Sequence, residues 1–421
     1  MELRNDIFII PSDEFGNIVY APLRRCVFTT NDVAARIIHK YKTDQLSLSE
    51  SEMSSPVWER LSEIEKINPL NPSTGFNVDL NNLTILLTDQ CNLACTYCYS
   101  KQYRASTILS QRKLQLAIDY VFSNNYSTKK RFTFIGGGEP TLAWDRLEWA
   151  IKYIRQKTDN SQSVYISLIT NGTLLSNERI DFLSRNNINI VFSYDILPFI
   201  QNKQRPMRSG REISHETVNN VIINSIKRGA TVKGIRATIT RESVNKMVDM
   251  VEYVNSFYPS IKLLDFELVT NTANPPQLYS DYIYWFFESV KTASSYGITL
   301  YNSITMSFNS LKTRFCQREF SLTPNGDITS CHRVSSHSNQ NYDLFKIGHI
   351  SEAIQLEKTI PTIKQLPTNC FDCFAKWHCA GGCISDRMQL SVIQQEEKCK
   401  FTKEIIKRLL ELKLKKELYH G

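Results

Sequence analysis

Three cysteines that lie close together in the sequence have a spacing that suits iron binding. Cys91, Cys95 and Cys98 form a CxxxCxxC motif. Three thiolates this close can hold three irons of a [4Fe-4S] cube and leave the fourth iron open to another ligand. A zinc site needs a fourth protein ligand, and no histidine or further cysteine lies within about thirty residues on either side. The motif therefore predicts an iron-sulfur cluster with one open iron.

Most of the eleven cysteines of the chain lie in its last quarter. The first residues are acidic and polar, whereas a signal peptide has a basic start and an apolar run. We therefore expect a cytoplasmic location, in which clustered thiols bind metals rather than form disulfides. Cys26 fits no cluster position, and we expect it to be a buried apolar side chain. The C-terminal cysteines are Cys316, Cys331, Cys370, Cys373, Cys379, Cys383 and Cys399.

The composition excludes several classes of protein. The chain has 421 residues, of which 42% are hydrophobic and 22% are charged, as in ordinary globular proteins. This length permits about three domains. The net charge of +8 is modest and does not require a nucleic acid partner. No apolar run approaches the ~18 residues of a membrane span, so we expect neither nucleic acid nor membrane as a partner.

Strand-like and helix-like segments alternate between residues 82 and 270. Six such strands separated by helices predict parallel βαβ units that curl toward a barrel. Reactive groups in such folds lie in the loops after the carboxyl ends of the strands. The first cysteine motif directly follows the first predicted strand and is therefore placed to do chemistry. The predicted strands are 84–88, 131–135, 164–170, 188–194, 232–240 and 263–269, and the helices include 114–122, 147–154 and 218–226.

The segments on either side of this alternating region predict separate parts. Two extended runs, 8–11 and 18–23, and a helix at 32–41 predict a small N-terminal α+β domain. Strand runs on either side of Gly326 predict a hairpin. The Lys-rich amphipathic segment 401–418 predicts a terminal helix, which we expect to be solvated. The predicted domains are residues 1–80, 81–310 and 311–421.

The first cysteine motif resembles that of the radical S-adenosylmethionine (AdoMet, or SAM) superfamily, and the resemblance covers about residues 82–270. In that family a CxxxCxΦC motif follows the first strand of a partial, TIM-like (β/α)6 barrel, and Tyr97 occupies the Φ position here. The resemblance implies that S-adenosyl-L-methionine chelates the open iron. It also implies reductive cleavage to a 5′-deoxyadenosyl radical that abstracts hydrogen from an unactivated C–H bond. The electron would come from a low-potential donor such as flavodoxin or ferredoxin.

Other loops of this region resemble the AdoMet-binding elements of the family. A GGGEP segment after the second strand looks like the element that contacts the AdoMet ammonium. Polar residues after the third and fourth strands match those that contact the ribose and the methionine carboxylate. The sequence departs from the common SxDG pattern at Ile196, and Gln201-Asn202 replaces a usual His-Asp pair. The residues implied to bind AdoMet are Tyr97, Gly136, Gly137, Gly138, Glu139, Asn171, Ser193, Asp195 and Arg205.

The seven C-terminal cysteines resemble the SPASM domain, which carries two auxiliary iron-sulfur clusters in radical AdoMet maturases. Two cubes need eight ligands, so the near cluster would have an open iron or a non-cysteine ligand. Together with the AdoMet cluster, the resemblance implies three [4Fe-4S] clusters. His332 follows Cys331 directly and would be a proton carrier or a structural hydrogen-bonding residue. The implied ligands are Cys370, Cys373, Cys379 and Cys399 for the distal cluster, and Cys316, Cys331 and Cys383 for the near one.

Radical AdoMet enzymes with SPASM domains mostly modify peptides or proteins. One branch installs crosslinks in ribosomally made precursor peptides (RiPP biosynthesis), and another matures anaerobic sulfatases by formylglycine formation. The sulfatase branch has an aspartate where this sequence has His332. The extra N-terminal residues 1–75 also favour the peptide branch, whose members often add a leader-recognition element at that end. We predict a metal-binding oxidoreductase, a peptide maturase that takes a precursor peptide with a leader. Sulfatase maturation is one alternative, and a zinc-stabilised binding protein is another.

Overall fold

The structure is a computed structural model, and it describes residues 2–44, 47–73, 78–123, 127–210, 213–270, 274–315, 318–352, 354–356 and 370–420. The chain divides into two units. We call Phe76–Asn302 with Gln317–Pro361 the barrel unit. We call Met1–Gly75, Ser303–Cys316 and Thr362–Gly421 the terminal unit. No helix among the described residues is long and apolar enough to cross a membrane.

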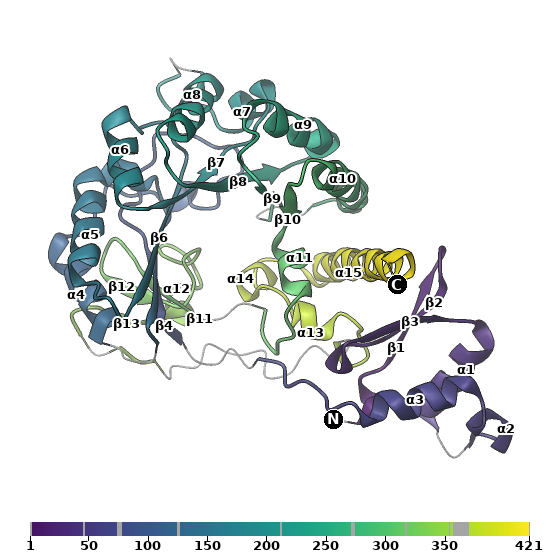
Figure 1. The fold of residues 1–421 in the computed structure, drawn as a ribbon. Coiled ribbons are helices and arrows are strands. Elements are labelled where there is room, and N and C mark those ends of the chain that lie inside the picture. Colours follow the sequence, from purple (N-terminus) through teal and green to yellow (C-terminus); the bar gives the residue numbers. More distant parts are fainter. Residues whose placement is uncertain are drawn as a thin grey trace. The chain divides into compact units, whose positions relative to one another are not determined.

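The barrel unit is built around one ten-stranded sheet with the order β10-β9-β8-β7-β6-β5-β4-β11-β12-β13 (Figure 1). Neighbouring strands from β10 to β11 are parallel, and β12 and β13 extend the sheet in antiparallel fashion. The strands are β4 (Val78–Ile85), β5 (Lys129–Phe134), β6 (Ser163–Thr170), β7 (Asn189–Ser193), β8 (Val232–Ile239), β9 (Leu263–Leu268), β10 (Thr299–Tyr301), β11 (Arg318–Leu322), β12 (Asp327–Thr329) and β13 (Lys346–His349).

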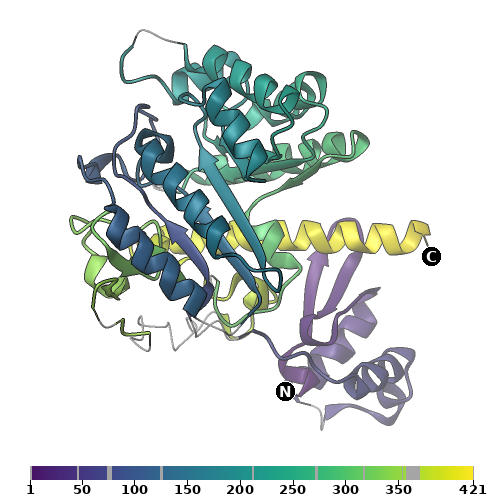
Figure 2. The same cartoon turned by 60° about the vertical axis from the view of Figure 1, so that its left-hand side comes forward.

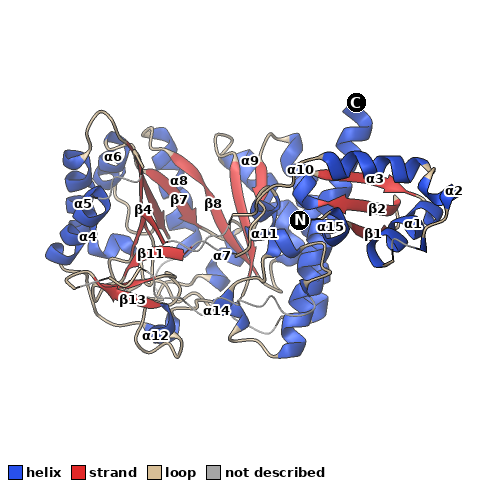
Figure 3. Cartoon of the chain, turned by 90° about the horizontal axis from the view of Figure 1, so that it is seen from below, coloured by secondary structure: helices blue, strands red, loops and turns tan. Residues whose placement is uncertain are grey.

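Helices connect the parallel strands and cover the outer face of the curved sheet (Figures 1 and 3). Burial alternates along β5, where Phe132 and Phe134 are fully buried while Lys129 and Arg131 are exposed. This period of two is that of a strand with one face packed under helices. These helices are α4 (Gln111–Ser123), α5 (Trp144–Lys157), α6 (Asn177–Arg185), α7 (Pro198–Gln204), α8 (Ser214–Lys227), α9 (Met247–Phe257) and α10 (Pro276–Ser295). A short helix, α12 (Tyr342–Phe345), lies between β12 and β13 in the chain.

The alternating pattern of the sequence correctly predicted six parallel strands and the helices between them. The first strand begins earlier than expected, at Val78, and ends at Ile85. Residues 86–88 leave β5 and bond elsewhere, since the Leu86 N–H donates to the Leu322 carbonyl and Thr88 forms a bridge with Ile108. The predicted hairpin around Gly326 is confirmed as β11 and β12. The pairing of β11 with β4 was not predicted, because the pairing of distant segments leaves no periodic signal in the sequence.

The terminal unit contains an antiparallel sheet of three strands in the order β1-β2-β3. Helices α1 and α3 pack on one face around Ile38, Leu61 and Ile64. The elements are β1 (Phe8–Ser12), β2 (Gly16–Ala21), β3 (Cys26–Thr30), α1 (Asp32–Thr43), α2 (Glu50–Met53), α3 (Pro56–Lys66), α11 (Ser303–Phe308), α13 (Lys376–Cys379), α14 (Ile384–Arg387) and α15 (Val392–His420).

The other face of the three-stranded sheet is covered by α15 (Figure 2). Ile406, Leu410 and Leu414 are buried against Ile10 and Ile18 of the sheet. The expectation of a solvated terminal helix is therefore wrong, because its apolar stripe closes a core. The N-terminal and C-terminal segments, which the sequence assigned to separate domains, pack together in this unit.

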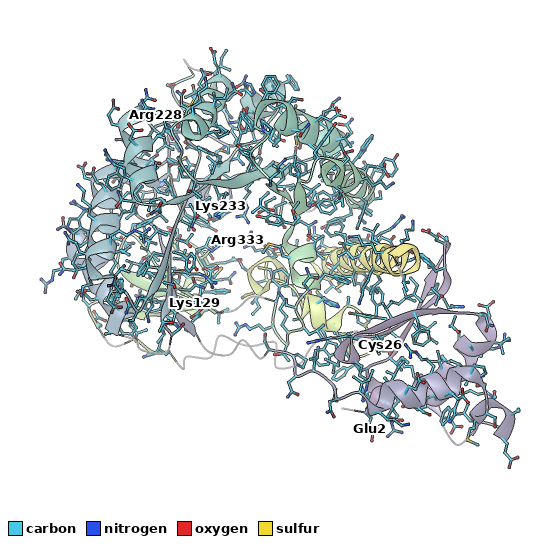
Figure 4. All side chains as sticks on the ribbon, viewed as in Figure 1. Glu2, Cys26, Lys129, Arg228, Lys233 and Arg333 are labelled. Atoms are coloured by element: carbon cyan, nitrogen blue, oxygen red, sulfur yellow. The ribbon has the colours of Figure 1, made fainter. Side chains whose placement is uncertain are left out.

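Cys26, labelled in Figure 4, lies on β3 and packs half-buried against the core of α1 and α3. Its thiol donates to the Arg24 carbonyl oxygen at 3.3 Å. Burial raises the pKa of this thiol. Cys26 therefore behaves as a packing residue, although part of it remains exposed.

Polar contacts also join the first strands to the segment that carries the C-terminal thiols. The Trp377 indole N–H donates to Asp6 Oδ1 at 2.6 Å, and the Tyr20 hydroxyl lies 2.6 Å from His378 Nε2. The Ser12 hydroxyl donates to Glu411 Oε1 at 2.7 Å. The first two contacts fall on residues between Cys373 and Cys379. These contacts join the N-terminal part of the terminal unit to the segment with Cys373 and Cys379, which would hold a metal cluster.

Replacement of Asp6 by alanine is expected to destabilise the terminal unit by about 3 kcal/mol, because two buried donors, Trp377 Nε1 and the Leu23 N–H, lose their acceptor. Native-state hydrogen exchange should show faster exchange of the β1–β3 amides. Asp13→Ala is the matched control, since Asp13 is exposed in the β1–β2 turn. Equal protection in the two variants would contradict the role given to Asp6.

Candidate active site

The three cysteines of the first motif lie in the loop after β4 and come together in the structure. Cys91 and Cys98 both act on the pKa of Cys95, which burial raises to about 12. Burial also raises the pKa of Cys91. Buried thiols of this kind keep their protons unless a metal replaces them. The three side chains thus fit a cluster that supplies positive charge to their thiolates.

Among the described residues, no three His, Cys, Asp or Glu side chains lie close enough to share one metal ion. A single zinc needs each thiolate sulfur about 2.3 Å away. Each iron of a cube takes its own thiolate, so the sulfurs stand further apart.

The GGGEP segment after β5 lies against the cysteine loop. The Gly138 N–H donates to the Thr88 carbonyl at 2.9 Å, and the Glu139 N–H donates to the Gln90 carbonyl at 2.7 Å. A Cβ atom on Gly138 would stand 1.7 Å from the Gln90 carbonyl oxygen. Glycine is therefore required here because two backbones meet directly.

The Glu139 carboxylate accepts hydrogen bonds from several protein donors. It accepts hydrogen bonds from the Thr141 N–H and hydroxyl, the Thr170 hydroxyl at 2.6 Å and the Asn171 N–H at 2.8 Å. Burial raises its pKa. The side chain of Asn171 donates in turn to Asn92 Oδ1 at 3.0 Å, inside the cysteine loop. These contacts join three loops, and a direct contact of Glu139 with AdoMet stays a prediction.

Asp195 is a second hub beneath the cysteine loop, and it brings together predicted residues from three parts of the chain. Its carboxylate accepts from the Tyr97 hydroxyl and from Gln204 Nε2, both at 2.7 Å. It also accepts from the Thr238 N–H at 3.0 Å and pairs with Arg205 Nη2 at 3.1 Å. The Arg205 guanidinium lies over the Tyr97 ring, 5.4 Å from its centroid. The predicted residues Tyr97, Asp195 and Arg205 therefore hold one another.

Ser193 lies at the end of β7, where its neighbour across the sheet is Arg236 of β8. It is partly exposed, and its predicted contact with AdoMet stays a prediction.

The backbone after α7 forms a support that sequence reasoning missed. The Ala94 and Thr96 N–H groups donate to the carbonyls of Pro206 and Gln204 at 2.8 and 2.9 Å. The Arg208 N–H donates back to the Asn92 carbonyl at 2.9 Å. Residues 204–208 thus pair with the cysteine loop like a short strand. Nothing in the local sequence predicts this pairing, since it depends on backbone groups alone.

Arg104 is the second feature that the sequence did not reveal. Its Nη1 donates to the Leu93 carbonyl at 2.8 Å, and its Nη2 donates to the Cys98 sulfur at 3.4 Å. Burial opposes ionisation of Cys98, but hydrogen bonds from Ser100 and Arg104 outweigh it and lower the pKa of this thiol. Of the three thiols of the motif, Cys98 is thus the one whose thiolate the protein itself favours.

Four of the C-terminal cysteines converge in the terminal unit. Cys370, Cys373 and Cys399 all act on the pKa of Cys379, which burial raises to about 12. Arg387 Nη2 lies 3.9 Å from the Cys399 sulfur. These four are the residues that the resemblance assigns to the distal cluster, and their convergence fits that group.

The near-cluster set is less fully described. Cys331 belongs to the barrel unit and Cys383 to the terminal unit, while Cys316 lies outside the described residues. Burial raises the pKa of Tyr99, and Cys98 and Cys331 both add to that shift. Cys331 therefore lies near the loop of the first motif. The predicted near cluster stays a prediction.

His332 is held by a single acidic side chain. Its Nδ1 lies 2.9 and 3.0 Å from the two oxygens of Glu319, and its main-chain N–H donates to the same carboxylate at 2.7 Å. Burial opposes ionisation of Glu319, but His332 outweighs it and lowers the pKa of Glu319 to about 2. The structural hydrogen bond expected for His332 is present, and its role as a proton carrier stays a prediction.

The barrel, the cysteine loop and its supports define the class of protein, and a family model agrees. Residues 85–254 match the Radical SAM superfamily. The barrel unit therefore carries a radical SAM domain, and this domain and its relatives indicate an enzyme. AdoMet and a [4Fe-4S] cluster are the cofactors that this superfamily implies. The zinc-stabilised binding module is therefore not the class to which it belongs.

Two curated relatives illustrate the similarity. An uncharacterized protein of Methanocaldococcus jannaschii is 26% identical over 190 residues, 45% of this chain and 63% of its own. The radical SAM cyclopropyl synthase TigE of Paramaledivibacter caminithermalis is 21% identical over 372 residues, 78% of this chain and 74% of its own. The chain thus spans between about three fifths and three quarters of these relatives.

Solved structures with the same fold extend beyond the barrel. Native anSMEcpe with bound AdoMet and Cp18Cys peptide matches with a TM-score of 0.67 at 20% identity, covering 79% of this chain and 98% of that one. Streptococcus suis SuiB bound to precursor peptide SuiA matches with a TM-score of 0.52 at 14% identity, covering 93% and 97%.

Proposed function

We propose that the protein is a maturase that abstracts hydrogen from a ribosomally made precursor peptide and installs a crosslink or a similar modification. The observation that carries the proposal is the fold likeness to SuiB, which covers a larger share of this chain than the likeness to anSMEcpe does. SuiB is seen with a precursor peptide, and TigE is named as a radical SAM cyclopropyl synthase. The three-stranded sheet of the terminal unit adds support, since β1 and β3 are edge strands. An edge strand can take up an extended leader by strand addition.

The residues of this chain have defined tasks in that reaction. When bound, AdoMet and the cluster supply the 5′-deoxyadenosyl radical. Asp195 accepts a hydrogen bond from Tyr97 of the cysteine loop, and Glu139 accepts one from the N–H of Asn171, whose side chain donates to Asn92 of the same loop. These contacts between protein groups help to fix the geometry of the loop. Such preorganisation positions a reactive centre before substrate arrives. We also propose that the C-terminal cysteines hold auxiliary clusters. A low-potential electron donor would supply the electron for the reaction.

Anaerobic co-expression with the short reading frames beside the gene tests the proposal. We expect one peptide to lose two hydrogen atoms for each crosslink, measured by mass spectrometry. The same peptide without its leader half should be modified at least about tenfold more slowly, since strand addition contributes binding energy. A Cys91→Ala variant is the matched control and should leave the mass unchanged.

Sulfatase maturation is the second candidate, favoured by the fold likeness to anSMEcpe. It predicts conversion of a sulfatase-derived cysteine peptide to formylglycine. Formylglycine formation with no change in any neighbouring peptide would replace the first proposal by this one.

A further inference from the structure

Arg104 reaches the cysteine loop from six residues beyond its last cysteine. The guanidinium donates to the Leu93 carbonyl at 2.8 Å and to the Cys98 sulfur at 3.4 Å, and it lies 3.5 Å from the Cys91 carbonyl. One planar side chain therefore touches the backbone and a thiol of the same metal-binding loop. A guanidinium keeps its charge at every pH at which the protein is folded.

The charge of Arg104 distinguishes it from the other arginine of this site. Arg205 is buried and paired with Asp195 at 3.1 Å, so its charge is balanced inside the protein. Arg104 forms no ion pair with any Asp or Glu of the described part of the chain, and the groups that favour its charged form are Cys91, Cys98 and Cys95. The thiolates themselves are its negative partners.

Ser100 is the other polar group beside the Cys98 sulfur, with its Oγ at 3.2 Å. The Ser100 hydroxyl donates to the Gly137 carbonyl at 2.6 Å. Because this hydroxyl has a single proton, the donors beside the sulfur are the Ser100 main-chain N–H and Arg104, and of these only Arg104 carries a charge.

We propose that Arg104 is the counter-charge of the radical SAM cluster and raises its reduction potential. One-electron reduction adds negative charge to the cluster and its thiolates, and hydrogen bonds to sulfur are a known means of setting cluster potentials. A charge-assisted N–H donor stabilises the more negative, reduced state. The electron comes from the external low-potential donor, and Arg104 itself gains and loses no bond. The proposal does not depend on which substrate the enzyme takes.

An EPR-monitored redox titration of the full-length, anaerobically reconstituted protein tests the proposal, with dithionite as the reductant. The signal that changes on addition of AdoMet identifies the cluster at the first motif. In Arg104→Gln we expect the ratio of reduced to oxidised cluster at a fixed potential to fall about tenfold, which is 59 mV for one electron. Arg104→Lys keeps the charge and should stay within about threefold of the parent ratio. Arg112→Gln, which removes an exposed cation of α4, is the matched control and should change nothing.

Two results would overturn the proposal. One is an Arg104→Gln ratio that equals that of Arg112→Gln. The other is an Arg104→Lys ratio that falls as far as that of Arg104→Gln, since charge would then not be the cause. Iron content and spin count show whether the Arg104→Gln variant holds the cluster. If it does not, the Arg104→Lys variant alone tests the proposal. A tenfold fall in that variant would then contradict the proposal, and a ratio near that of the parent would support it.

Discussion

Alanine at Cys91, Cys95 and Cys98 together is expected to abolish reductive cleavage of AdoMet. The three thiols are the ligands that the first motif offers, and burial raises the pKa of both Cys91 and Cys95, so these two thiols are charged only with a metal present. Without three thiolates no open iron can be presented to AdoMet. Formation of 5′-deoxyadenosine, measured by chromatography under dithionite, should fall to the level of the protein-free blank.

The same variant tests whether the C-terminal cysteines bind iron independently. With two auxiliary cubes it should retain about eight of about twelve irons, four for each cluster. Cys26→Ala is the matched control, because Cys26 packs on β3 against the core of α1 and α3, and it should keep both cleavage and iron. Cleavage above the blank in the triple variant would show that the cysteine loop is not the AdoMet site. Loss of nearly all iron would instead contradict the auxiliary clusters.

Asp195→Asn is expected to lower the free energy of unfolding of the barrel unit by about 3–5 kcal/mol, because it leaves the buried Arg205 cation without its partner. The new amide would also present a donor where the carboxylate accepts from Tyr97, Gln204 and the Thr238 N–H. Because Tyr97 belongs to the cysteine motif, the cluster should assemble poorly. Urea unfolding and iron content of the anaerobically purified protein measure both effects.

Asp181→Asn provides the comparison for this prediction. Asp181 pairs with Arg228, labelled in Figure 4, and both side chains are more than a third exposed. Solvent screens such a pair, so its loss should cost less than about 1 kcal/mol. If the two variants were equally stable and equally rich in iron, Asp195 would not be the hub that its contacts indicate.

The sequence determined those features that are written in short-range patterns. The spacing of Cys91, Cys95 and Cys98 predicts an iron-sulfur cluster, because three neighbouring thiolates can hold three irons of a cube. This prediction needs no knowledge of the fold. The close backbone approach at the GGGEP segment could also be predicted, because glycines before a carboxylate at a strand end indicate it. The alternation of strands and helices predicted the parallel sheet, since period two and period 3.6 are visible within each segment.

Only the tertiary structure decided how that chemistry is supported. Arg104 and the backbone of residues 204–208 hold the cysteine loop, and neither belongs to a periodic pattern or a motif. Asp195 and Glu139 were predicted as ligand contacts, whereas their oxygens also serve protein donors from several loops. Long-range hydrogen bonds of this kind depend on which segments the barrel brings together, and that information is not local.

The division of the chain into parts shows the same limit. The sequence placed boundaries near residues 80 and 310, because composition and periodicity change there. The structure instead packs β1–β3 against α15, with Trp377 bonded to Asp6. An amphipathic stripe in the sequence says that a helix has an apolar face, but it does not name the surface that covers it. That partner is fixed only when segments almost 400 residues apart meet, as Ser12 and Glu411 do at a separation of 399 residues.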